Sequence, residues 1–531
     1  MRSSSRSIHP GPGPRLYWTA AAGLLLAHFV LAAASTRGQS LTYDEPNHLR
    51  YGEQILAGNP DRFDDSKMPF SALNAGVVRL ARGLFPSLFQ GTWQPERIGR
   101  LATILFSTLF ASVILTWATA WYGRAAGLAA LFLYALEPNI LAHAGLITTD
   151  IYASGMIALS ILSFRWFLSH PTLPRAAGCG LVIGLSQLAK YTSVFVYPIL
   201  LLLGAIHVSR GPVRFSLARV RAWAFLLATF LVVNLLVLNA GFLFNRTFTP
   251  LGQYRFRSDL FRNLQSALPG LKSLPVPLPY PYLEGLDWVR QRDQSGEGYG
   301  NVYLLGEARS DRGFAWYYLI AYLLKAPIPE ILALSAALIG YVRGRRWDTF
   351  RHREAYLLIP AAFLALYFNF LLEAQLGIRL FLVVFPFLIV FSTRLVLSPE
   401  MLSPAQGRLL AVAALYMAAS VASYFPHYIP YFNELTWDRL RAHRLLADSN
   451  LDFGQAEGQL ARYLEQHPEV IVEPADPQPG TILVSVNRLT GVREGPERYA
   501  WLRENFEPVG HMAYAYLIYE VSPEELRAIT P

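Results

Sequence analysis

The sequence has a single cysteine, Cys179, and only 16% of its residues are charged. One cysteine excludes an intramolecular disulfide, so any exported part of the chain must fold without one. With 53% hydrophobic residues over 531 positions, the chain has too little charge for one soluble domain of this size. The composition therefore predicts a polytopic membrane protein.

Lysine is also scarce, since it occurs only at positions 67, 190, 272 and 325. The net charge of +9 comes mainly from arginines in short clusters between apolar runs. Such clusters orient membrane helices, and they do not predict a nucleic-acid partner. The P-loop, the GxGxxG turn, HExxH and the GxSxG elbow are absent too, so the sequence shows no means of binding a nucleotide.

Eleven apolar spans are predicted from runs long enough to cross a bilayer at about 1.5 Å per residue. The arginine clusters before the first run, at 210–221 and at 343–353, are expected in the cytoplasm. The run 176–207 must then cross twice, with an outer turn at Lys190, because a single crossing would invert every later span. The predicted spans are 17–35, 98–121, 125–142, 151–168, 176–207 (two crossings), 223–244, 328–342, 356–372, 380–396 and 409–424.

This topology predicts a cytoplasmic N-terminus and an extracytoplasmic C-terminus. We expect a membrane domain over residues 1–424, with outer loops at 36–97 and 245–313, and a small outer α/β domain over 425–531. A helix at 455–466 and strands at 481–486 and 513–521 are predicted within the second domain. The predicted fold class is an all-α polytopic membrane protein with about 11 transmembrane helices and a C-terminal α/β domain.

The first outer loop carries two adjacent carboxylates, Asp44 and Glu45, followed by His48. A partly dehydrated carboxylate near the membrane surface can act as a base near neutral pH. The loop therefore predicts a catalytic site at the membrane–water interface. The alternative is that both acids are ordinary solvated loop residues.

Other polar residues lie close to the predicted membrane surface. His143 and Asp150 bracket a short outer link, where Asp150 could instead cap the helix that follows. Three cations lie in or beside apolar runs, where a charge is costly unless it is paired or wetted: Lys190, Lys325 and Arg379. Any two of them could bracket a phosphate, and snorkelling to the interface is the alternative.

Several motifs, taken together and in order, resemble the bacterial relatives of protein O-mannosyltransferases, within the GT-C membrane glycosyltransferases. They run from about residue 15 to 466 and comprise Tyr43-Asp44-Glu45-Pro46-Asn47-His48, LAHAGLITTD at 141–150, LAKYT at 188–192, KAPIP at 325–329, GIR at 377–379, YFNEL at 431–435 and DSNLDFGQ at 448–455. Two positions depart from the pattern. Lys67-Met68-Pro69-Phe70 stands where relatives tend to have a histidine and paired prolines, and Phe453 stands in place of tryptophan.

The resemblance implies a multi-pass hexosyltransferase of the plasma (inner) membrane, with catalysis on the non-cytoplasmic face. It implies a sugar donor linked to a polyprenyl phosphate and, as in protein O-mannosylation, an acceptor hydroxyl on a protein, a lipid or a glycan. Asp44 and Glu45 are the predicted catalytic residues, with Asp44 as the base. The predicted substrate-binding residues are His48, His143, Asp150, Lys190, Tyr191, Lys325 and Arg379.

No metal-ligand set is complete in the sequence, although the oxygen ligands of the outer acids would suit Mg²⁺ or Mn²⁺. A polytopic transporter or lipid-linked sugar flippase is the rival interpretation. Transporters place ionisable residues near the midplane and often show repeated halves, whereas the candidates here gather at one face and no repeated halves are found. A structural scaffold would leave the loop around Asp44 unexplained.

Overall fold

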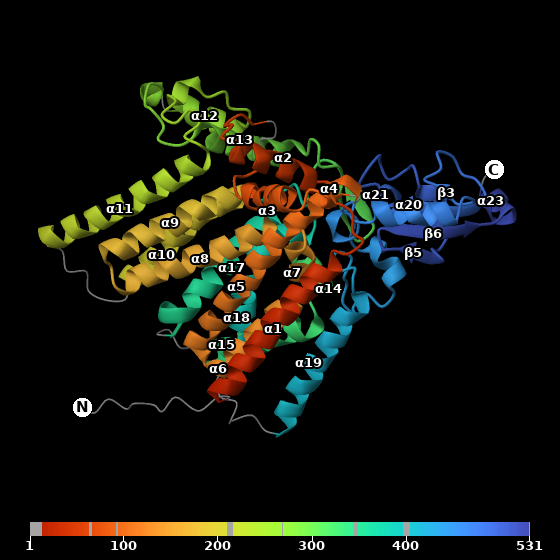
Figure 1. Cartoon of the computed structure of the whole chain (residues 1–531), viewed down its shortest axis with the longest axis horizontal. Coiled ribbons are helices and arrows are strands. Elements are labelled where there is room, and N and C mark those ends of the chain that lie inside the picture. Colours follow the sequence, from red (N-terminus) through yellow and green to blue (C-terminus); the bar gives the residue numbers. More distant parts are fainter. Residues whose placement is uncertain are drawn as a thin grey trace.

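The computed structural model describes residues 13–62, 66–91, 94–209, 216–267, 269–344, 349–396 and 404–529. Figure 1 shows a bundle of long helices with a layer of short helices over one end and a small β-sheet beside that end. We call this end of the bundle the sheet end and the opposite end the far end. The first helix, α1 (Pro14–Ser35), starts at the far end and leads to the sheet end.

Helices lie at all eleven predicted spans within the described residues. Six of these helices are long and apolar enough to cross a membrane, and two bent pairs, α6–α7 at 61° and α14–α15 at 120°, bring the number to as many as eight. The polytopic fold class is therefore confirmed. After α1, the bundle helices are α5 (Arg100–Tyr122), α6 (Arg124–Leu136), α7 (Pro138–Ala144), α8 (Asp150–Ser169), α9 (Leu173–Ala189), α10 (Val196–Val208), α11 (Leu217–Gly241), α14 (Tyr317–Lys325), α15 (Ile328–Gly344), α17 (Ala355–Phe370), α18 (Phe385–Ser392) and α19 (Pro404–Tyr424).

The run 176–207 is broken into two helices, as the arginine pattern predicts. α9 ends at Ala189, Lys190 is extended (φ −160°, ψ 149°), and a short 3₁₀ turn leads into α10. α9 packs closely along α11, because a Cβ at Gly180 would lie 2.5 Å from the carbonyl oxygen of Phe230 and one at Gly184 would lie 2.8 Å from Cβ of Val237. Small residues four apart permit such an approach between membrane helices.

Short elements cover the sheet end of the bundle (Figure 1). They include α2 (Glu45–Leu56), α3 (Ser71–Leu84) and α4 (Leu88–Gly91) from the first loop, and α12 (Asp259–Ala267) and α13 (Tyr280–Ser295) from the second. A hairpin of β1 (Val302–Leu304) and β2 (Glu307–Arg309) follows α13. Both loops that the sequence placed on the outer side thus lie at the same end of the bundle.

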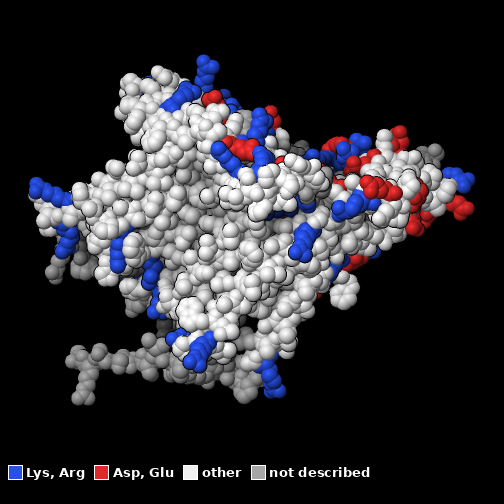
Figure 2. Space-filling view, viewed as in Figure 1, with Lys and Arg blue, Asp and Glu red and all other residues white. Residues whose placement is uncertain are grey.

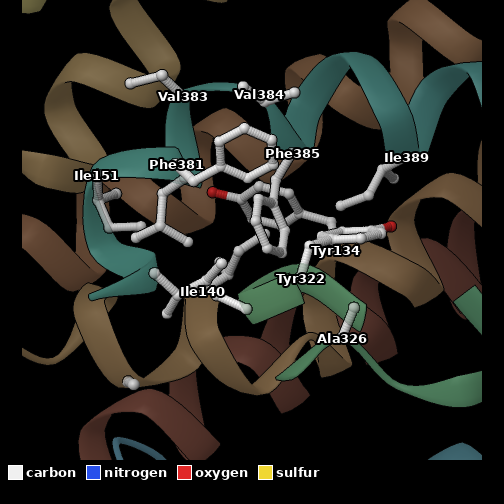
Figure 3. Packing of buried hydrophobic residues seen from close by; sticks show 14 of the residues in the cluster. Tyr134, Ile140, Ile151, Tyr322, Ala326, Phe381, Val383, Val384, Phe385 and Ile389 are labelled. Atoms are coloured by element: carbon white, nitrogen blue, oxygen red, sulfur yellow. The ribbon is translucent and has the colours of Figure 1, made fainter. Parts of the chain in front are cut away.

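A core of aromatic and branched side chains joins the bundle helices (Figure 3). Tyr322 of α14 packs against Phe381 and Phe385, with ring centroids 6.4 and 5.4 Å apart. Phe381 belongs to a 3₁₀ segment, η6 (Ile378–Val383), whose carbonyl at Leu382 accepts from the Ser154 hydroxyl of α8. The backbone of η6, which carries Arg379, is therefore fixed by packing on both sides.

The C-terminal region forms a four-stranded sheet in the order β3-β4-β6-β5, with β3 parallel to β4 and the other pairs antiparallel. The predicted helix and both predicted strands are present. The elements are α20 (Glu457–Gln466), β3 (Ile471–Val472), β4 (Gly480–Ser485), α21 (Val486–Leu489), α22 (Ala500–Asn505), β5 (Gly510–Met512), β6 (Tyr516–Val521) and α23 (Pro523–Ile529). This region joins the first loop through backbone bonds from Ser40 to Gln455 (3.0 Å) and from Tyr43 to Phe453 (3.1 Å).

Charge is distributed unevenly over the molecule. Figure 2 shows Asp and Glu gathered at the sheet end and over the C-terminal sheet, whereas Lys and Arg also occur toward the far end. Of the predicted cytoplasmic clusters, Arg2, Arg6, Arg210, Arg214, Arg345 and Arg346 lie outside the described residues.

Candidate active site

Asp44 lies at the start of α2, between the end of α1 and the layer of short helices. One carboxylate oxygen accepts from Arg379 Nη1 at 2.7 Å, and the other lies 3.6 Å from Lys67 Nζ. Burial alone would raise the pKa of the Asp44 carboxyl, but the charges of Arg379 and Lys67 hold it well below its usual range. The Asp44 side chain is still 30% exposed, so a substrate can reach it.

Arg379 is held in place by the loop at 448–450. Gly377 has φ +77°, and a Cβ there would lie 2.5 Å from Ser449 Oγ. Asn450 Oδ1 accepts from the Ile378 amide at 3.0 Å, and the Arg379 guanidinium lies 4.4 Å from the centre of the Phe453 ring. Arg379 acts electrostatically on the carboxylates at the three positions Asp44, Asp150 and Asp448. It is therefore the common centre of the site.

A second ion pair lies nearby, because Lys190 Nζ donates to a carboxylate oxygen of Asp150. Lys190 comes from the break after α9 and Asp150 from the first residue of α8. The Phe70 amide donates to the Leu188 carbonyl at 3.2 Å, which ties the segment after Lys67 to the Lys190 break. Three cations from distant parts of the sequence thus face one region: Lys67, Lys190 and Arg379.

The predicted histidines and Tyr191 line the same region. His143, in α7, is buried, its Nδ1 has no hydrogen-bond partner within the described residues, and it interacts electrostatically with Asp150 and Arg379. The Nδ1 atom of His48 lies 2.8 Å from Ser71 Oγ, and His48 interacts electrostatically with Asp44. Tyr191 accepts at its hydroxyl from Arg62 Nη1 at 3.0 Å.

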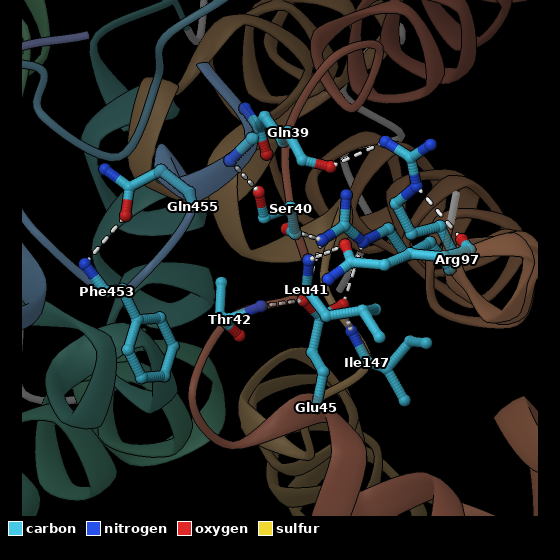
Figure 4. Close-up of polar contacts among 12 residues, drawn as sticks. Gln39, Ser40, Leu41, Thr42, Glu45, Arg97, Ile147, Phe453 and Gln455 are labelled. Atoms are coloured by element: carbon cyan, nitrogen blue, oxygen red, sulfur yellow. Dashed lines mark hydrogen bonds and ion pairs between the residues drawn. The ribbon is translucent and has the colours of Figure 1, made fainter. Parts of the chain in front are cut away.

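Glu45 is placed differently from the sequence-based expectation (Figure 4). Its fully buried carboxylate forms a two-point ion pair with Arg100, at 2.8 and 2.7 Å. The same oxygens accept from the amides of Ile147 at 2.8 Å and Thr42 at 2.6 Å. Since both oxygens are occupied, this geometry argues against the catalytic role that the adjacent acids suggested. Glu45 joins the loop, α5 and the link before α8.

Lys325 likewise does not face a phosphate site. It is fully buried, and its ammonium group donates to the carbonyls of Ile429 (3.0 Å), Tyr431 (2.9 Å) and Asn450 (2.9 Å). An ammonium group has three donors, so all of them are used. We correct the substrate-binding expectation: Lys325 fastens the loop at 450 to α14.

Two further residues belong to the site although the sequence did not predict them. Lys67 was recognised only as a departure from the family pattern, yet the scarcity of lysine is a signal that could have singled it out. Asp448 has an unusual left-handed backbone (φ 56°) and interacts electrostatically with Arg379 and Arg493. Arg493 lies over the ring of Tyr43 at 4.7 Å, so the C-terminal region reaches the residue next to Asp44.

No group of three or more His, Cys, Asp or Glu side chains that could hold a metal ion occurs in the described part of the chain. The carboxylates of Asp44 and Asp150 are instead each paired with a cation. The arrangement can bind an anionic group through the cations and present Asp44 as a proton acceptor.

No protein-family model matches the chain, and no curated protein matches its sequence. Among solved structures, ArnT from Cupriavidus metallidurans bound to undecaprenyl phosphate is similar, with 14% identity, a TM-score of 0.47, and 97% of this chain and 99% of that chain covered. An oligosaccharyltransferase from Archaeoglobus fulgidus, tethered to an acceptor peptide containing an NVT sequon, is similar with 13% identity and a TM-score of 0.50.

The second match covers 81% of this chain and 57% of the oligosaccharyltransferase, so this chain spans little more than half of that protein's length. At such identities the likeness concerns the fold alone. The oligosaccharyltransferase, whose TM-score supports a comparison of folds, is a polytopic membrane protein of the GT-C type. The chain therefore has the GT-C fold, as the sequence motifs predicted, while its place among the protein O-mannosyltransferases stays a prediction.

Proposed function

We propose that this protein is a membrane glycosyltransferase that moves a sugar from a polyprenyl-phosphate donor to an acceptor hydroxyl. The observation that carries the proposal is the partly exposed Asp44 carboxylate, which is paired with Arg379 and Lys67 at the sheet end of the bundle. A carboxylate beside clustered cations matches a reaction that removes a proton from one group and releases a phosphate from another.

The donor side of the site consists of Lys67, Lys190 and Arg379. Charge-assisted donors in a partly dehydrated place are what a phosphate requires, and all three cations are at most about one-fifth exposed. In the free protein they are matched with Asp44 and Asp150. A lipid phosphate would compete with these carboxylates for the same cations, with its chain along the apolar helices.

Binding of the phosphate would also make Asp44 a stronger base. When the phosphate engages Arg379 and Lys67, Asp44 loses the charges that depress its pKa, and its affinity for a proton rises. The acceptor oxygen then attacks the anomeric carbon, the bond from that carbon to the phosphate oxygen breaks with its electron pair, and Asp44 takes the hydroxyl proton. General-base assistance of this kind contributes about 10²–10⁴ in rate.

The remaining residues have supporting roles in this proposal. His48, His143, Asp150 and Tyr191 surround the donor sugar, and Arg493 with Tyr43 forms the acceptor side. We further propose a membrane domain over 1–424 and an outer domain over 425–531, with catalysis on the non-cytoplasmic face of the plasma (inner) membrane. The sugar is a hexose and the acceptor a protein, lipid or glycan hydroxyl, with protein O-mannosylation as the narrower form.

The proposal is tested by replacing Asp44 in membranes. Asp44→Asn keeps the size of the side chain and removes the proton acceptor, so we expect sugar transfer to fall by at least about 10²-fold with unchanged protein abundance. Transfer is measured by mass spectrometry of the glycoproteins and lipids in cells with and without the protein. Asp476→Asn, at an exposed position of the C-terminal region, is the matched control and should transfer normally.

Normal transfer by Asp44→Asn would overturn the catalytic assignment. Lys190→Ala should chiefly weaken use of the lipid donor, and an unchanged dependence on donor concentration would remove Lys190 from the phosphate site. Movement of a lipid-linked sugar across the bilayer without any new glycosidic product would favour the flippase interpretation instead.

A further inference from the structure

Residues 243–274, which we call the α12 segment, connect the outer end of α11 to α13 and carry α12 at their tip. The two limbs of the segment are joined by backbone hydrogen bonds. Phe248 and Val276 are linked at 3.0 Å, Leu251 and Leu274 at 3.1 Å, and the Gly252 amide donates to the Lys272 carbonyl at 2.8 Å. The segment is therefore a hairpin whose two limbs are held together by backbone hydrogen bonds.

A column of aromatic rings fixes the position of α12. Tyr254 stacks on Tyr280 of α13 with centroids 4.6 Å apart, Phe256 stacks on Tyr254 at 5.4 Å, and Phe261 of α12 packs on Phe256 at 5.2 Å. Where the chain enters α12, Asp287 of α13 accepts from the Ser258 amide at 2.9 Å and from its hydroxyl. α12 is consequently held against α13 and presents a defined outer surface.

That surface is apolar. Leu260 and Leu264 lie one turn apart on α12, on the same side of the helix, and each is 49% exposed. Exposed single hydrophobic residues are ordinary on a protein surface, but several gathered together mark an interaction site. The exposed large hydrophobic residues of the segment are Leu243, Phe244, Phe248, Leu260, Leu264, Leu271 and Leu274.

The location of the segment identifies what covers this surface. α11 exposes apolar side chains along its length, among them Leu231, Val232 and Leu236, and is a candidate membrane span with little of its surface buried in the protein. The segment begins directly after α11, and Figure 1 shows α12 beyond the sheet end of that helix, away from the C-terminal sheet. Its apolar surface thus continues the lipid-facing surface of α11 to the edge of the bilayer.

The charge of the segment specifies the kind of lipid. Five basic residues and a single acid, Asp259, occur between positions 243 and 274, and the basic residues are Arg246, Arg255, Arg257, Arg262 and Lys272. Figure 2 shows Lys and Arg beside an uncharged surface at this corner of the molecule. Basic residues next to an inserted apolar face attract anionic headgroups.

We infer that the α12 segment is a membrane-surface anchor that binds anionic phospholipids of the leaflet at the sheet end. Leu260 and Leu264 lie at the boundary between headgroups and acyl chains, and the surrounding cations contact lipid phosphates. The inference goes beyond the proposed reaction and does not depend on it.

The anchor is connected to the donor side of the site through Arg62. Arg62 donates to the carbonyl of Pro281 in the first turn of α13, the helix that follows the segment, at 2.6 Å, and to the hydroxyl of Tyr191 at 3.0 Å. It also donates to the Lys67 carbonyl at 3.1 Å. The bilayer contact therefore supports the position of the backbone that carries Lys67.

The test places a nitroxide label on the full-length protein in liposomes. With Cys179→Ser as background, Leu260→Cys and, separately, Leu264→Cys are labelled, and Val509→Cys in the exposed C-terminal region is the control. Collision of the label with oxygen and with a water-soluble nickel chelate is measured in phosphatidylcholine and in phosphatidylcholine–phosphatidylglycerol vesicles. We expect a severalfold higher oxygen-to-nickel ratio at 260 and 264 than at 509, and a further rise with phosphatidylglycerol.

A second experiment tests the basic residues. Combining Arg255→Gln, Arg262→Gln and Lys272→Gln should remove the increase in the oxygen-to-nickel ratio that phosphatidylglycerol causes. Salt at about 1 M should do the same, because the screening length falls to about 3 Å. Equal nickel access at positions 260 and 509 would overturn the anchor. Immersion that is the same in both kinds of vesicle would overturn the assignment of anionic lipid as the partner.

Discussion

Asp44 and Glu45 are neighbours in the sequence, but their carboxylates have different surroundings. Asp44 precedes α2 and faces Arg379 and Lys67 in a partly open space, whereas Glu45 begins the helix and is enclosed with Arg100. The start of a helix turns successive side chains about 100° apart, so adjacent acids seldom share a site. Only Asp44 remains accessible to a substrate.

Glu45→Gln should therefore act on stability. Arg100 is fully buried, and removing the charge that compensates it costs about 3–5 kcal/mol. We expect a lower melting temperature and a lower yield in detergent, with activity per folded molecule largely retained. Glu465→Gln, on the exposed side of α20, is the control and should melt like the unmodified protein. A variant that melts normally but loses turnover would restore the catalytic role of Glu45.

The ion pairs of Asp44 predict a particular pH dependence. Arg379 and Lys67 hold the pKa of Asp44 below its usual range in the free protein, so the acid limb of kcat/KM should lie below that of an ordinary carboxyl group. The acid limb of kcat should lie at higher pH than that of kcat/KM. In the complex the bound phosphate engages the same cations, so they lower the pKa of Asp44 less.

Lys67→Gln removes one positive charge near Asp44 and should move the acid limb of kcat/KM upward by about one pH unit. Arg527→Gln, on exposed α23, removes a charge far from the site and should leave the limb in place. The measurement is the rate of sugar transfer against pH at low donor concentration. A limb that does not move in Lys67→Gln would show that this lysine does not tune Asp44.

Among single residues, the sequence best identifies charged side chains that lie in apolar surroundings, because a buried charge needs a partner. Lys190 and Arg379 stand out in apolar surroundings, and the structure brings both beside carboxylates. Lys325 stands out for the same reason, yet backbone carbonyls satisfy it. Sequence shows that a buried cation needs partners, but it does not show whether those partners are carbonyls of a distant loop or a substrate.

At the scale of elements, the site is built where helices break. Lys190 is the extended residue between α9 and the 3₁₀ turn η2 (Tyr191–Phe195), and Arg379 lies in the short η6 segment before α18. The first break could be predicted, because the positive-inside pattern required two crossings. The second could not, because the hydrogen bonds that hold Leu376 and Ile378 come from Ser449 and Asn450, which lie 73 and 72 residues further along the chain.

The clamping loop also carries Asp452, a buried acid whose pKa is raised to about 7 by burial. Its neighbours are the Gly454 amide and Arg493, which favour the charged form, and Asp448 and Glu473, which oppose it. A carboxyl group whose pKa is higher in the folded than in the unfolded protein stabilises the fold at low pH. Its contribution is complete below about pH 4 and is lost as pH rises through about 7.

We therefore expect the melting temperature of the protein in detergent to fall between pH 5 and pH 8 (a window set about the raised pKa), and Asp452→Asn to reduce that fall. The asparagine keeps the side-chain volume and mimics the neutral acid, so it should stabilise the protein chiefly at the upper pH. Thermal unfolding at several pH values measures this. An equal slope for both proteins would show that Asp452 does not titrate in this range.

At the scale of the whole molecule, the chemistry is concentrated at one end. The first loop, the α12 segment and the C-terminal sheet all lie at the sheet end, and the acidic side chains gather there (Figures 1 and 2). Described basic residues at the far end include Arg219, Arg221, Arg343, Arg351, Arg353 and Arg408. Basic residues near the ends of spans are retained in the cytoplasm, so the sheet end should face outward.

This orientation decides whether the proposed reaction is feasible on the outer face, and cysteine labelling tests it. With Cys179→Ser as background, Trp437→Cys after α19 and Leu217→Cys at the start of α11 are both highly exposed. A membrane-impermeant maleimide added to intact cells should label position 437, and it should label position 217 only after permeabilisation. Labelling of 217 alone in intact cells would place Asp44 and its cations on the cytoplasmic face, where a donor presented from the outer leaflet could not reach them.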